Sequence, residues 1–213
     1  EPKVSDAHMQ AADGSLALGR GQVLRDVRFY MLLPLYTSSP FLLTGMFFHQ
    51  VQLAEAFGWS LVSLASAFVF YAGTKIITSL IVGPLVDRYT SLRVFPLVFL
   101  PLSLGFCVLV VPQTWLQDFA PFVYLFFIGV NLGMTAPVSG ALWPELFGAK
   151  NLGAIRSMTT SIMIFATAAA PVTFGAVLDM GVSFEQISVV CIFYLAGCAG
   201  LAFLASRIKL SDK

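Results

Sequence analysis

The fold is decided by residues 60–93, which read SLVSLASAFVFYAGTKIITSLIVGPLVDRYTSLR. From Ser60 to Gly83 this stretch is apolar apart from hydroxyl residues and one cation, Lys75. Such a run is long enough to cross a hydrocarbon core of about 30 Å as a helix. A cation at mid-membrane costs at least about 2.5–3.5 kcal/mol, and it usually faces a polar cavity on the path of a solute or ion. Lys75 is therefore the first candidate for a functional residue.

The composition of the whole chain is that of a membrane protein. Of 213 residues, 58% are hydrophobic and 11% are charged, whereas soluble domains average about 25% charged residues. Backbone groups in lipid must satisfy their own hydrogen bonds, and long apolar runs without strict alternation favour helices over a barrel. The sequence predicts an all-α membrane protein with six transmembrane helices. The six apolar runs are 29–54, 60–83, 94–111, 120–143, 153–178 and 187–206.

The basic residues predict how the chain is oriented. Apart from Lys75, every Lys and Arg lies in or beside the connections on one side of the predicted helices. The opposite connections, 57–59, 112–119 and 179–186, carry only acidic or neutral residues. Short loops rich in Lys and Arg stay cytoplasmic. We therefore expect a multi-pass protein of the cell (inner) membrane with both termini in the cytoplasm.

The polar ends of the chain divide it into three parts. Residues 1–27 are expected to form a cytoplasmic linker that ends in a short interfacial helix, since Gln22–Arg28 mixes apolar and charged residues. Residues 28–207 are expected to form the six-helix transmembrane domain, and residues 208–213 a cytoplasmic tail. A net charge of +1 predicts no nucleic-acid partner. The expected environment is the lipid bilayer.

The connection between the second and third runs carries a recognisable pattern. Gly83 is followed four residues later by Asp87, then by Arg88, and Arg93 follows beyond them. This connection resembles the signature loop of the major facilitator superfamily, with Thr90 at the place where that family prefers a second Gly. The connection 143–156 is similar to the corresponding loop in many bacterial members. Without the resemblance, the basic residues of this connection are also explained as a simple anchor that keeps it on the cytoplasmic side of the membrane.

The resemblance implies a specific architecture and partner. Residues 22–207 look like the C-terminal six-helix half of such a transporter, built from two three-helix inverted repeats. The partner would be the N-terminal six-helix half of the same transporter, with a small-molecule substrate bound between the halves. In that family the first, second, fourth and fifth helices of a half line the cavity, while the third and sixth face outward.

Hydroxyl and amide residues near mid-membrane accompany Lys75. In the second run they recur at three- and four-residue steps on one face, with Lys75 at its border. One cation with an amide and hydroxyls suits a carboxylate or similar anion. Helix packing also explains such faces, and Lys75 could instead snorkel or pair with an acid outside this chain, while Asn131 could bond between helices. The candidate substrate-binding residues are Lys75, Tyr71, Thr74, Asn131, Thr160 and Ser161.

A second set of residues is placed to gate the path or couple transport to an ion. Asp87 could cap a neighbouring helix, and Glu145 could pair with Arg156. His49 is expected near the outer end of the first apolar run. A His can titrate near neutral pH, which suits proton coupling, although a lone His at the membrane interface is more often a polar anchor. Gly129 and Gly133 have the small-xxx-small spacing of close helix contacts. The candidate gating residues are Asp87, Arg88, Arg93, Glu145 and Arg156, and the possible coupling residue is His49.

Taken together, these features favour secondary active transport of a small organic solute, with an anion such as a carboxylate favoured by Lys75. The alternative is a non-transporting membrane receptor or assembly module whose hydroxyl faces only pack helices. An enzyme has little support, because the sequence offers no His and carboxylate cluster and no phosphate-binding Gly loop. No cofactor and no metal are expected.

Overall fold

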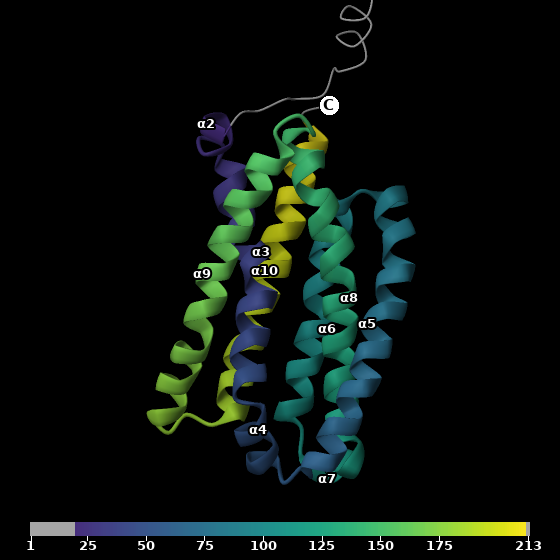
Figure 1. Cartoon of the computed structure of the whole chain (residues 1–213), viewed down its shortest axis with the longest axis vertical. Helices are drawn as coiled ribbons and strands as arrows, with labels where there is room; N and C mark the ends of the chain where they lie inside the picture. The colour runs from purple at the N-terminus through teal and green to yellow at the C-terminus, as the bar shows by residue number, and fades with distance from the viewer. Residues whose placement is uncertain (1–19, 212–213) are drawn as a thin grey trace, which may run out of the picture.

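The computed structural model describes residues 20–211, and within them every regular element is a helix (Figure 1). Six of these helices are long and apolar enough to span a membrane, which confirms the predicted fold class. The helices are α2 (Arg20–Val23), α3 (Val27–Phe48), α4 (Gln50–Phe57), α5 (Leu61–Tyr89), α6 (Ser91–Val110), α7 (Gln113–Leu116), α8 (Ala120–Phe147), α9 (Leu152–Asp179) and α10 (Phe184–Ser211), with a 3-10 turn at Gln117–Phe119.

The helices extend beyond the apolar runs, because a helix can continue through the headgroup region without apolar residues. The turn expected over 83–93 shrinks to the single residue Thr90 between α5 and α6. The expected interfacial helix at 22–28 is also not continuous: α2 ends at Val23, and Asp26 caps the start of α3. The expected linker 1–19 lies outside the described residues. Helix α10 runs through 208–211 of the expected tail, and 212–213 lie outside.

The packing follows the symmetry of two three-helix repeats, α3–α5–α6 and α8–α9–α10. The first helix of each repeat packs against the second helix of the other, so that α3 pairs with α9 and α8 pairs with α5. The third helices, α6 and α10, pack against each other and against α8 and α3, respectively. In Figure 1, α6 and α10 accordingly run behind α8 and α3.

The two outermost helices are the least buried. In Figure 1, α5 and α9 stand at opposite edges of the bundle with α8 and α3 between them. Only 17% of the apolar window of α5 and 11% of that of α9 is buried, against 56% for α6. Most of the surface of α5 and of α9 is therefore not covered by the other described helices.

Candidate functional site

Helix α5 places Lys75 at its centre. The helix runs from Leu61 to Tyr89 and is capped by Ser60, whose hydroxyl accepts a hydrogen bond from the Ser63 amide. Lys75 is equally far from both ends, about 21 Å at 1.5 Å per residue. Because α5 is long and apolar enough to span a membrane, Lys75 lies at the middle of a membrane-spanning helix.

Two glycines of α8 hold α5 in close contact. A Cβ atom on Gly133 would lie 2.7 Å from the Lys75 carbonyl oxygen, and one on Gly129 would lie 2.9 Å from the Tyr71 carbonyl oxygen. Such distances leave no room for a side chain on either glycine. The small-xxx-small spacing on α8 thus does serve a close helix contact, and this contact fixes the position of the backbone that carries Lys75.

The Lys75 side chain lies on the exposed surface of α5. Among residues 20–211 it has no hydrogen-bond or ion-pair partner. At about 100° per residue, Lys75 shares a stripe with Ala72 and Ser79. The large exposed aliphatic side chains Val69 and Leu80 lie on the far side of the helix. Lys75 therefore lies on a different side of α5 from these two aliphatic side chains.

Thr74 and Asn131 lie inside the helix packing. Thr74 is buried against Gly129 and donates its hydroxyl hydrogen to the Phe70 carbonyl oxygen of its own helix. Asn131 is fully buried, and its Nδ2 donates to the Val98 carbonyl oxygen at 2.8 Å and to Ser39 Oγ at 3.4 Å. Asn131 therefore links α8 to α6 and α3, as the alternative interpretation of the sequence proposed. Ser39 was not a candidate, because the sequence does not show which of the adjacent residues Thr37, Ser38 and Ser39 faces α8.

Tyr71 is half-buried beside Lys75, with its ring centroid 5.9 Å from those of Phe47 and Phe68. Thr160 and Ser161 lie on α9, where Ser161 is exposed and donates to the Ser157 carbonyl oxygen. Because α5 and α9 stand at opposite edges of the bundle (Figure 1), the structure does not bring these two hydroxyls together with Lys75. Thr160 and Ser161 were expected at a depth similar to that of Lys75, but they lie on a helix that does not pack beside α5.

The expected pair of Glu145 and Arg156 does not form between these two described residues. Both Glu145 carboxylate oxygens accept from the Ser91 amide at 2.9 Å, and one accepts from the Ser91 hydroxyl at 2.6 Å. Arg156 donates instead to the Gly140 carbonyl oxygen at 2.8 Å. The first amides of a helix are unpaired and carry partial positive charge. Glu145 is attracted to that end of α6, so it connects α8 to the turn after α5.

Asp87 caps no helix in the described part of the chain, contrary to expectation. Its side chain is exposed on α5 without a hydrogen-bond partner there, and Glu145 fulfils the capping role at α6. Arg88 and Arg93 are also exposed, with the Arg88 guanidinium 5.5 Å from the centre of the Tyr89 ring. These three charges remain available at the end of the bundle that carries the basic residues.

His49 stands directly after the first membrane-spanning helix, at the break between α3 and the short helix α4. It separates α3 from α4, is 9% exposed, and its Nδ1 lies 2.9 Å from the Gly45 carbonyl oxygen. Its Nε2 lies 3.4 Å from where a Cβ on Gly175 of α9 would be, so the ring sits at the contact of α3 and α9. The apolar run gave no sign of this break, since no Pro or Gly marks it.

A sequence model of the Major Facilitator Superfamily matches residues 28–212. The chain belongs to the major facilitator superfamily. The match covers all six membrane-spanning helices, which make up one six-helix half of the superfamily fold. Comparison with curated proteins and with solved structures gives no match.

Membership of the major facilitator superfamily explains the geometry of the turn between α5 and α6. Thr90 stands where the superfamily's signature loop prefers Gly, and its backbone has φ 71° and ψ 146°. This region of backbone space is nearly confined to Gly, because a Cβ atom clashes there. Thr90 therefore adopts the backbone conformation that Gly permits, and it is strained there.

Proposed function

We propose that this six-helix half works with an N-terminal six-helix half as a secondary active transporter, which moves a small organic anion such as a carboxylate by alternating access. The observation that carries this proposal is the ammonium group of Lys75. It lies at the centre of a membrane-spanning helix, on the exposed surface, without an acidic partner in residues 20–211. Membership of a superfamily of membrane transporters supports the general function.

The energetics favour an anion as the missing partner. An ammonium group near the midplane is costly unless water or an opposite charge accompanies it. A carboxylate that binds Lys75 through a charge-assisted hydrogen bond would offset that cost. Because the stripe of Lys75, Ala72 and Ser79 has small side chains beside the cation, it leaves space for such a ligand.

Within this proposal the candidate residues have unequal roles. Lys75 and Tyr71 contact the anion on the α5 side of the path, while Thr160 and Ser161 contact it or its water from α9 when the two halves close around it. Thr74 and Asn131 act as positioning residues, since the Thr74 hydroxyl donates to a carbonyl oxygen of its own helix and Asn131 Nδ2 donates to the Val98 carbonyl oxygen of α6. The two gating arginines, Arg88 near the end of α5 and Arg93 near the start of α6, face the cytoplasmic headgroups together with Asp87.

Gating and coupling follow from the same arrangement. Glu145 and Arg156 each bind a backbone or hydroxyl group of the bundle end that carries the basic residues. We propose that release of these contacts accompanies opening on the cytoplasmic side. His49 is the proposed proton-coupling residue, because it stands at the break between α3 and α4 and touches α9.

Uptake into proteoliposomes tests the proposal, using the full-length transporter and a panel of radiolabelled mono- and dicarboxylates with neutral sugars and amines as comparison. Lys75→Gln is expected to reduce carboxylate uptake at least tenfold, while Lys75→Arg retains part of it. Lys150→Gln is the matched control, since Lys150 is an exposed lysine of the α8–α9 connection. Undiminished carboxylate uptake by Lys75→Gln would refute the proposal that Lys75 binds an anionic substrate. Failure of the unaltered protein to move any solute would favour a receptor or assembly module.

A further inference from the structure

A cavity, here named the outer pocket, lies at the end of the bundle opposite the basic residues, outside the proposed substrate path. It has a volume of about 510 Å³ and lies between the α4–α5 connection and the α7 segment. Ligand pockets typically have volumes of about 300–1,000 Å³. The residues that matter for its chemistry are Phe57, Trp59, Gln113, Gln117 and Asp118.

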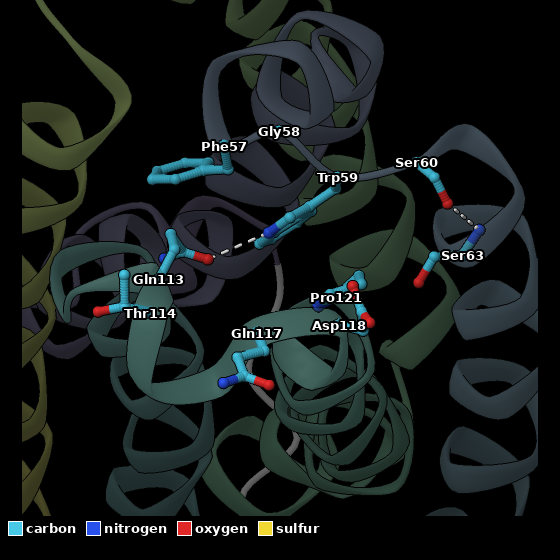
Figure 2. Close-up of a pocket in the computed structure, with 10 residues that line it drawn as sticks. All are labelled: Phe57, Gly58, Trp59, Ser60, Ser63, Gln113, Thr114, Gln117, Asp118 and Pro121. Atoms are coloured by element: carbon cyan, nitrogen blue, oxygen red, sulfur yellow. Dashed lines mark hydrogen bonds between the residues drawn. The ribbon is translucent and has the colours of Figure 1, made fainter.

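One wall of this outer pocket is aromatic and rigidly held. Gly58 adopts a left-handed conformation with φ 67°, which turns the chain so that the rings of Phe57 and Trp59 stack with centroids 5.5 Å apart. The Trp59 indole NH donates to Gln113 Oε1 at 3.1 Å, a bond drawn in Figure 2. A hydrogen bond and a stacked ring therefore fix this wall in place.

The opposite wall supplies a carboxylate. Figure 2 shows Gln117 and Asp118 across the pocket from Trp59. Asp118 is exposed and has no hydrogen-bond or ion-pair partner among residues 20–211, and it is the only charged residue that lines the pocket. Gln117, just before it, has a φ of 48°, so the backbone that presents the carboxylate is itself strained.

The surroundings reinforce the negative charge of this pocket. The helix ends and connections at this end of the described chain carry four acids and no Lys or Arg. Nothing nearby in residues 20–211 therefore neutralises Asp118. The acids are Glu55, Asp118, Asp179 and Glu185.

We infer that the outer pocket binds an organic ammonium group, with its carbon substituents against Phe57 and Trp59 and its charge facing Asp118. Aromatic rings attract such cations, and a carboxylate at the same site adds Coulomb attraction. The group can come from a free solute or from the headgroup of an ethanolamine or choline phospholipid. The inference does not depend on the proposed transport of anions.

Equilibrium binding of radiolabelled choline to the full-length protein in phosphatidylglycerol nanodiscs tests the site. Saturable binding is expected, with at least a tenfold higher Kd in Asp118→Asn and no change in Asp179→Asn, an acid at the same end that does not line the pocket. Phe57→Leu is expected to weaken binding severalfold. The neutral isostere 3,3-dimethylbutanol should not compete. Absence of saturable binding, or equal binding by Asp118→Asn, would overturn the inference.

Nanodiscs that also contain phosphatidylethanolamine distinguish the two sources of the ammonium group. If the lipid headgroup fills the pocket, the apparent Kd for choline rises with the ethanolamine lipid content. If the pocket takes a free solute, the Kd stays constant across the lipid series. Either result retains an ammonium site at Asp118, whereas a Kd that falls as the ethanolamine lipid replaces phosphatidylglycerol would mean that the anionic lipid competes, which would contradict the charge assignment.

Discussion

Replacement of Gly133 by Ala is the sharpest perturbation of the contact that positions Lys75. The new Cβ would lie 2.7 Å from the Lys75 carbonyl oxygen and 2.6 Å from Thr78 Cβ, and ordinary contact begins at 3.4 Å. Since the backbone fixes the positions of both atoms, α5 must move by about 0.8 Å relative to α8 to bring both distances to 3.4 Å. Overpacking of this kind costs about 1–3 kcal/mol. It must also outweigh the higher helix propensity of Ala, about 1 kcal/mol in water.

Thermal unfolding in detergent measures this cost, with a thiol-reactive fluorophore that reports exposure of the buried Cys191 and Cys198. For a domain of this size, each kcal/mol corresponds to about 2–4 °C, so overpacking by about 1–3 kcal/mol should place the apparent Tm of Gly133→Ala about 2–12 °C below that of Gly73→Ala. Gly73→Ala is the control, because a Cβ there meets nothing within 4 Å. Equal apparent Tm values for Gly133→Ala and Gly73→Ala would refute the close packing of α5 on α8.

Three further outcomes are expected from the same unfolding assay. Glu145→Gln should lose about 1 kcal/mol by removing the charge from the N-terminus of α6, while Asp87→Asn, on the exposed face of α5, changes stability by less than about 0.5 kcal/mol; equal effects would argue against the capping contact. Thr90→Gly should stabilise the protein by about 1 kcal/mol, because Gly relieves the positive φ; destabilisation would mean that Thr90 is not strained. The hydrogen bond from the Arg28 side chain lowers the pKa of Asp26 below its ordinary value of 3.8, with burial opposing it. The stabilisation by Asp26 is therefore present above about pH 4 and lost as the pH falls through the lowered pKa, so the penalty of Asp26→Asn, about 0.5 kcal/mol at neutral pH, should vanish in acid; a penalty independent of pH contradicts it.

Much of the fold could be predicted because hydrophobic length and charge sidedness are properties of the sequence itself. The six spanning helices and the close contact at Gly129 and Gly133 follow from such local patterns. The break at His49 could not be predicted, because neither Pro nor Gly marks it and the contact with α9 is visible only in three dimensions.

The candidate site was harder to predict for the same reason. Depth along a helix is readable from the sequence, but the direction of a side chain and the distance between helices are not. Thr74 and Asn131 have suitable depth yet are buried among neighbouring helices, and Thr160 belongs to α9, which stands at the opposite edge of the bundle from α5. The partners of Glu145 depend on where α8 ends relative to the start of α6, which no spacing in the sequence encodes.

The most direct test of the central claim is the aqueous accessibility of position 75 in the intact membrane. Lys75→Cys and Leu80→Cys, in a background without native cysteines, are compared in their rate of reaction with an anionic, membrane-impermeant methanethiosulfonate. Leu80 is 72% exposed on the aliphatic side of the same helix. If Lys75 faces a water-filled path for anions, cysteine at position 75 reacts at least tenfold faster than cysteine at position 80. Equal, slow reaction at both positions would place Lys75 against lipid and contradict the proposed function.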